Sequence, residues 1–282
     1  MIDRERLVTL VSQALREELG AEAARERALD GAGALMLPPE RGANVGTAYD
    51  GAALAAMVAA QPARIAVGRT GRGTRYTTTT LLRFRADHAA ARDAVMSEVS
   101  PELLARLGLF EVTTRATDKR HFLARPDAGR ALSDDARAEL TRRLPRAPQL
   151  VVIYGDGLSA TALNEHLETY HRALTAELTT RGLRAAPAFF VRRSRVKVMD
   201  EIARLVDAES ALFVCGERPG LGFADSLSAY YIYRPGQGAT DAQREVISNI
   251  NPRGLEPPRA ARLTADAIAR ILRDRRSGVV TR

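Results

Sequence analysis

The sequence predicts an α/β fold: a C-terminal domain with a Rossmann-like, mostly parallel sheet, preceded by a small helical domain and an N-terminal helical extension. Two observations favour it. Beyond Pro101, short β-branched or aromatic runs alternate with longer helical stretches, as in βα units. Several of these runs are hydrophobic without a break, as in parallel strands covered on both faces. The 282 residues suffice for one large or two modest domains.

Three segments of different character follow one another along the chain. Residues 1–48 are predicted to hold an amphipathic helix from Asp3 to Leu19, because apolar residues recur there at helical spacing, and then a linker. The linker is rich in Ala, Gly, Glu and Arg and contains Pro38-Pro39. Residues 49–100 again show helical periodicity and are predicted to form the small helical domain. Residues 101–282 are predicted to form the Rossmann-like domain.

Within this last segment the strands and helices can be placed individually. The predicted strands are Leu150–Tyr154, Ala188–Val191, Ala211–Cys215, Ala229–Tyr233 and Val246–Ser248. The predicted helices are Thr161–Arg181, Val198–Val206 and Arg259–Arg273.

The loops that follow the strands are the candidate binding segments, because ligands of open α/β sheets lie at the carboxyl ends of the strands. Gly155-Asp156-Gly157-Leu158-Ser159-Ala160 matches the pattern G-x-G-x-x-A before a helix. With the arginines Arg192 and Arg193 after the next strand, it supports an alternative interpretation as an NADP-binding Rossmann module. Asp156 opposes that interpretation, because its charge would face a pyrophosphate. The loop after the predicted strand Ala211–Cys215 runs from Gly216 to Gly222. Its glycines permit close backbone approach, and Glu217 offers a carboxylate acceptor.

Other classes of function find less support. The net charge of +8 comes almost entirely from arginines interspersed with acidic residues, so we expect no nucleic-acid partner. No apolar run is long enough to span a membrane and the N-terminus lacks a secretory pattern, so a cytoplasmic location is expected. The single cysteine, Cys215, is expected in the core. The four histidines are scattered and form no metal-binding or triad pattern.

A series of short motifs carries a resemblance to a known family. They are Gly68-Arg69-Thr70-Gly71, Leu81-Leu82-Arg83-Phe84, Ala86-Asp87-His88, Thr117-Asp118-Lys119, Ala124-Arg125-Pro126-Asp127 with Gly129-Arg130, Asp156-Gly157-Leu158-Ser159, Phe189-Phe190-Val191-Arg192, Arg195-Val196-Lys197, Gly216-Glu217-Arg218-Pro219-Gly220-Leu221-Gly222, Ser226-Leu227-Ser228 and Ile247-Ser248-Asn249-Ile250. In order and spacing the chain resembles, over about residues 50–282, the small subunit of ethanolamine ammonia-lyase, a heteromeric adenosylcobalamin enzyme.

The resemblance implies a function and a set of site residues. It implies that the chain packs against a large catalytic subunit, six copies of each, with cobalamin between the two. The chain lacks the D-x-H-x-x-G motif of base-off proteins, in keeping with the base-on cofactor of that family. The cobalamin contacts of the family correspond here to Val196, Glu217 and Val246. Cobalamin is a flat ligand rimmed by carboxamides, which suits apolar contacts and a carboxylate acceptor.

The N-terminal helix has three open interpretations. It docks on the chain's own core, it serves solubility or assembly, or it directs the enzyme into a bacterial microcompartment. The last is considered because such short amphipathic helices on tethers resemble microcompartment tags and ethanolamine lyases are among that cargo.

Overall fold

The computed structural model describes residues 78–236 and 239–278, and the statements below concern these residues. The predicted helix from Asp3 to Leu19, its linker and most of the predicted helical domain lie outside them. The first described element is α4 (Thr78–Met96). Residues Ala89–Arg282 form one of the two compact units into which the chain divides, and this unit holds the sheet.

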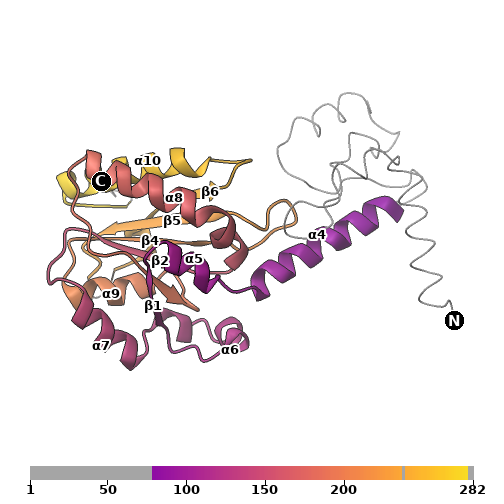
Figure 1. Cartoon of the computed structure of the whole chain (residues 1–282), viewed down its shortest axis with the longest axis horizontal. Coiled ribbons are helices and arrows are strands. Elements are labelled where there is room, and N and C mark those ends of the chain that lie inside the picture. The colour runs from indigo at the N-terminus through magenta and orange to yellow at the C-terminus, as the bar shows by residue number, and fades with distance from the viewer. Residues whose placement is uncertain (1–77, 237–238, 279–282) are drawn as a thin grey trace. The chain divides into compact units, whose positions relative to one another are not determined.

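A single six-stranded sheet organises this unit (Figure 1). Its order is β1-β3-β2-β4-β5-β6. The strands are β1 (Phe110–Thr113), β2 (Val151–Gly155), β3 (Phe189–Arg192), β4 (Ser210–Gly216), β5 (Leu227–Tyr233) and β6 (Glu245–Ile250). Each of the five predicted strands is confirmed with small shifts of its ends, whereas β1 was not predicted.

The sheet is mixed, so the prediction of a mostly parallel sheet is wrong for its second half. Strands β1, β3, β2 and β4 run parallel to one another, but β5 is antiparallel to both β4 and β6. The physical reason is the connection between β4 and β5. Residues 217–226 contain no helix and are too few for a crossover, which needs about a dozen residues, so the chain turns back beside β4.

Helices cover both faces of the sheet, as Figure 1 shows. One face packs against α5 (Pro101–Arg106), α8 (Ala160–Thr180) and α10 (Pro257–Asp274). The other face packs against α7 (Asp134–Arg143) and α9 (Val198–Val206). The three short elements are α6 (Lys119–Ala124), η1 (Ala128–Arg130) and η2 (Asp241–Gln243). The predicted helices at 161–181, 198–206 and 259–273 are confirmed as α8, α9 and α10.

The sequence explains where the helices begin. Ser159, Ser133 and Asp118 each accept a hydrogen bond from a backbone N–H in the first turn of α8, α7 and α6, respectively. The central strands β2 and β4 are buried at every residue, and their side chains alternate between the two helical layers. The hydroxyl of Tyr170 donates to Thr264 Oγ1 at 2.9 Å, which ties α8 to α10 inside the first layer.

The fold bears on two further expectations, which concern membrane-spanning helices and the burial of Cys215. Among residues 78–236 and 239–278, no helix has both the length and the apolar character that crossing a bilayer requires. Cys215 is a buried, unpaired thiol at the end of β4, as predicted for a core residue, and burial raises its pKa.

Candidate functional site

The carboxyl ends of the four parallel strands meet at one edge of the sheet, where the direction of winding reverses. From β2 the chain passes through α8 to β3 on one side, and from β3 it passes through α9 to β4 on the other side. The reversal places the loops after β2 and β4 next to each other. This is where open α/β sheets bind their ligands, and the loops chosen from the sequence lie at this edge.

The N-terminus of α8, where a dinucleotide would bind, is closed by the chain itself. The backbone N–H of Leu158 donates to the carbonyl of Gly216 at 3.1 Å, and Ser159 Oγ donates to the carbonyl of Ala224 at 2.6 Å. A Cβ atom on Gly216 would lie 2.0 Å from the Ser159 carbonyl oxygen, and one on Gly157 would lie 2.4 Å from the Gly216 oxygen. These glycines therefore permit backbone-to-backbone packing, and Gly216 does not approach a ligand as its loop had suggested.

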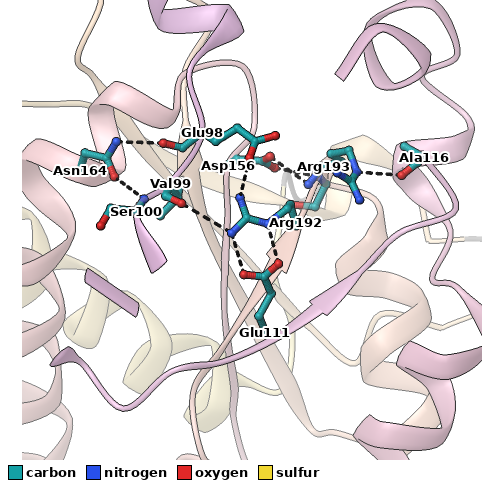
Figure 2. Close-up of polar contacts among 10 residues, drawn as sticks. Glu98, Val99, Ser100, Glu111, Ala116, Asp156, Asn164, Arg192 and Arg193 are labelled. Carbon is teal, nitrogen blue, oxygen red and sulfur yellow. Dashed lines mark hydrogen bonds and ion pairs between the residues drawn. The ribbon is translucent and has the colours of Figure 1, made fainter. Parts of the chain in front are cut away.

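The Asp156 side chain binds the backbone of the loop between β3 and α9 (Figure 2). It does not face a phosphate site. Its buried carboxylate accepts hydrogen bonds from the backbone N–H groups of Arg193 and Ser194, both at 2.9 Å. Burial raises the pKa of Asp156, and the positive charge of Lys119 opposes that shift. The contacts fix the turn that leads from β3 into the segment carrying Arg195 and Val196.

The two arginines that the NADP interpretation needs are also engaged. Figure 2 shows Arg192 in a two-point ion pair with Glu111, at 2.5 and 2.6 Å. The guanidinium of Arg193 donates to the carbonyl of Ala116 at 2.8 Å. With the α8 N-terminus covered and both arginines paired, the geometry disfavours a dinucleotide site.

Beside these loops lies a concavity of about 410 Å³. Its lining comprises Arg130, Arg195, Val196, Lys197, Tyr230, Asp241, Arg244 and Val246. Two of the three predicted site residues, Val196 from the β3–α9 loop and Val246 from β6, therefore line one surface. Val246 is opposite Tyr230 in the β5–β6 register and is 47% exposed, which is high for a valine in a strand.

The third predicted residue, Glu217, lies next to this concavity and is not part of its lining. Glu217 Oε1 accepts hydrogen bonds from Ser228 Oγ and from the backbone N–H of Asn249, both at 2.7 Å. Burial raises the pKa of Tyr230, while a hydrogen bond with Ser228 lowers it. Glu217 thus contacts Ser228, which shares a face of β5 with the lining residue Tyr230, and it also joins β4, β5 and the end of β6.

The walls of the concavity are rich in cations. Arg244, whose side chain is only 4% exposed, pairs with Asp200 at 2.7 Å and with Asp241 at 2.5 Å. Lys197 Nζ lies 3.6 Å from Asp241. A lining that combines apolar side chains with charged ones suits a ligand that has flat apolar faces and polar groups around its rim.

Sequence reasoning did not identify two important residues of this surface, Tyr230 and Arg244. Tyr230 follows the motif Ser226-Leu227-Ser228 and shares a strand face with Ser228, so period-2 alternation could have indicated it. Arg244 had no signal, because its position depends on η2 and on the ion pair with Asp200 in α9. No group of three metal-binding side chains occurs in the part of the chain that the structure describes.

Comparison with known proteins decides the family. The model of the ethanolamine ammonia-lyase light chain family matches residues 52–282. The chain belongs to the ethanolamine ammonia-lyase light chain family. It is 38% identical over 229 residues to the ethanolamine ammonia-lyase small subunit of Clostridium acetobutylicum, covering 81% of this chain and 94% of the relative. The small subunits of Fusobacterium nucleatum and Clostridioides difficile are each 39% identical, over 77% and 79% of this chain and 73% and 75% of the relatives.

Membership of the ethanolamine ammonia-lyase light chain family confirms the resemblance drawn from the motifs. It identifies the chain as a subunit of a lyase. The family match begins at residue 52, so the predicted N-terminal helix and linker precede it.

Proposed function

We propose that the chain is the small subunit of an adenosylcobalamin-dependent ethanolamine ammonia-lyase and forms one wall of a base-on cobalamin site. The other wall, the substrate pocket and the catalytic residues belong to a large subunit. The observation that supports this most is the meeting of Val196 and Val246 in one concavity, with Glu217 next to it and in contact with Ser228. The names of the relatives, each called a small subunit, support a large-subunit partner.

The size of the concavity supports a shared site. A volume of about 410 Å³ is at the lower end of what a drug-sized ligand occupies, which is roughly 300–1,000 Å³. Cobalamin is larger than such ligands, so this chain would cover only part of it. Val196, Tyr230 and Val246 would provide apolar contact, and the Glu217 carboxylate would accept from a ligand amide or hydroxyl. When bound, adenosylcobalamin supplies the radical chemistry through its cobalt–carbon bond.

The role of the protein residues in this proposal is placement of the cofactor and exclusion of water. Asp156 holds the loop that carries Val196, and the Glu217 carboxylate holds the ends of β5 and β6 together. Both contacts keep the concavity formed before a ligand arrives, which lowers the entropic cost of binding.

The first test concerns the division of labour between the subunits. The purified chain with adenosylcobalamin should not convert ethanolamine to acetaldehyde and ammonia, whereas the complex with the large subunit should. The reason is that the proposal places the substrate pocket and the catalytic residues in the large subunit. Acetaldehyde release by the chain alone would contradict this assignment.

A second test uses Glu217. In the assembled complex, Glu217→Ala is expected to weaken cobalamin binding by about 1–3 kcal/mol, since a ligand donor loses its acceptor. The change also removes the acceptor for Ser228 and Asn249, so the melting temperature should fall as well. Affinity is measured by absorbance titration. A variant that melts earlier but binds cobalamin unchanged would show that Glu217 serves only the strand ends.

A third test concerns the N-terminus. We propose that residues 1–48 are a separate extension, that residues 49–100 form a helical domain, and that the helix from Asp3 to Leu19 directs the enzyme into a bacterial microcompartment. Deleting residues 1–20 should leave cobalamin binding and lyase activity intact, because the family match begins only at residue 52. The same deletion should abolish recruitment of a fused fluorescent reporter to shells. Failure of the truncated chain to assemble would assign the helix to the core.

A further inference from the structure

Three arginines lie in or beside the concavity and form no ion pair with an acidic residue in the described part of the chain. Arg130 ends η1, Arg195 lies between β3 and α9, and Arg218 follows Glu217. Arg130 and Arg195 line the concavity. Within residues 78–236 and 239–278, no carboxylate forms an ion pair with any of the three, which we call the arginine cluster. Other arginines do pair, as Arg137 does with Glu201 and Arg270 does with Glu245.

The position of Arg195 is fixed by contacts that leave its charge uncompensated. Its guanidinium carbon lies 4.4 Å from the centre of the Phe122 ring, and Nη2 donates to the Phe122 carbonyl at 3.3 Å. Its backbone N–H donates to the carbonyl of Gly129 at 2.7 Å, and a Cβ on Gly129 would lie 2.9 Å from Arg195 Cγ. Its buried Nε has no hydrogen-bond partner in the described part of the chain. A buried donor of this kind is costly unless a ligand accepts from it.

The charges around Arg195 favour an anion. Burial lowers the pKa of Arg195, and the positive charges of Arg130 and Arg218 lower it further, while Asp156 acts in the opposite direction. The Asp156 carboxylate, however, is already engaged by two backbone N–H groups. An anion among the three guanidinium groups would relieve their mutual repulsion.

We propose that the arginine cluster binds the phosphodiester group of the cobalamin nucleotide tail, an assignment that rests on the proposed function. The acetamide and propionamide groups around the corrin ring are neutral, whereas the nucleotide tail carries a negatively charged phosphodiester. Guanidinium groups match the geometry of phosphate oxygens. The neutral donors of the ligand suit the Glu217 carboxylate next to the concavity, so the proposed site has separate positions for the two kinds of ligand group.

The test compares two ligands in the complex with the large subunit. Hydroxocobalamin carries the nucleotide tail, and diaquocobinamide lacks it. The variants Arg130→Gln and Arg218→Gln are expected to bind hydroxocobalamin about tenfold more weakly each, the usual effect of losing one charge-assisted contact. Their affinity for diaquocobinamide should not change. Both positions are exposed, so neither substitution disturbs a packed side chain.

Controls separate charge from shape. Arg195→Lys keeps the charge and should retain part of the preference for hydroxocobalamin, whereas Arg195→Gln should lose it. Arg273→Gln removes an equal charge from α10, where Arg273 is 73% exposed beside Asp274, and should alter neither affinity. Inorganic phosphate should compete with hydroxocobalamin and not with diaquocobinamide.

The outcomes are distinguishable. Equal weakening of both ligands, or no weakening of either, would overturn the assignment of the arginine cluster while leaving the proposed function intact. Phosphate that binds without displacing hydroxocobalamin would identify a site for free anions and would also overturn it. If the unaltered complex bound neither ligand, the proposed function would fail and the assignment with it.

Discussion

Replacing Gly216 with alanine is expected to destabilise the chain by about 3 kcal/mol or more, at the upper end of the cost of overpacking. The added Cβ would lie 2.0 Å from the carbonyl oxygen and 2.7 Å from the carbonyl carbon of Ser159, both backbone atoms that cannot rotate away. Relief requires that β4 and the start of α8 separate. Thermal unfolding of the assembled complex should show a melting temperature lower by roughly 6–12 °C, or no complex should form.

Gly220→Ala is the matched control, because Gly220 lies four residues further along the chain, in the connection after β4, and a Cβ there would meet no atom within 4 Å. It should melt like the unaltered protein. If Gly216→Ala melted like Gly220→Ala, the close contact between Gly216 and Ser159 would not exist in solution. The conclusion that the chain itself closes the N-terminus of α8 would then be wrong.

Replacing Asp156 with alanine is expected to cost about 3–5 kcal/mol, the range for removing one partner of a buried charged arrangement. The change leaves the N–H groups of Arg193 and Ser194 without their acceptor and removes the negative charge that favours the charged form of half-buried Lys119. Because the loop carries Arg195 and Val196, cobalamin affinity in the complex should fall together with stability. Urea unfolding and absorbance titration measure the two effects.

The control for this prediction is Asp127→Ala. Asp127 forms an ion pair with Arg125 in which both side chains are mostly exposed, so its loss should change stability little. Asp156→Asn should be intermediate, since one amide oxygen can still accept a hydrogen bond from one of the two N–H groups. Equal stability of the Asp156→Ala and Asp127→Ala variants would contradict the inference that Asp156 stabilises the loop between β3 and α9.

The buried strands of the fold could be predicted from the sequence because burial on both faces leaves a composition signal. Strands β2 and β4 are buried throughout and appear as unbroken hydrophobic runs. Strand β1 was missed because it is an edge strand of four residues, in which Glu111 is exposed and pairs with Arg192. Short edge strands carry a weak pattern.

The direction of β5 and β6 could not be predicted as easily. Hydrophobicity alone predicted that one strand ends at Cys215 and the next begins at Ala229. The connection between these predicted ends is long enough for a crossover. In the structure β4 extends to Gly216 and β5 begins at Leu227, and the shorter connection allows only an antiparallel return. A difference of three residues in strand ends therefore changed the predicted topology.

In the candidate site, the residues could be named from the sequence, but their contacts could not. Val196 and Val246 were named through the family motifs, yet they are fifty residues apart, and only the pairing of β6 with β5 brings them to one concavity. The internal contacts of Glu217 with Ser228 and Asn249 had no signal in the sequence, because they depend on how three strand ends meet.

The central claim is that this chain forms a cobalamin site with a large subunit, and absorbance of the purified complex tests it most directly. The chain and its large subunit are co-expressed, incubated with adenosylcobalamin and passed through a desalting column. The complex is predicted to retain the visible spectrum of base-on adenosylcobalamin, whereas the chain alone should retain none. A colourless complex, or a complex that retains NADP and no cobalamin, would contradict the account.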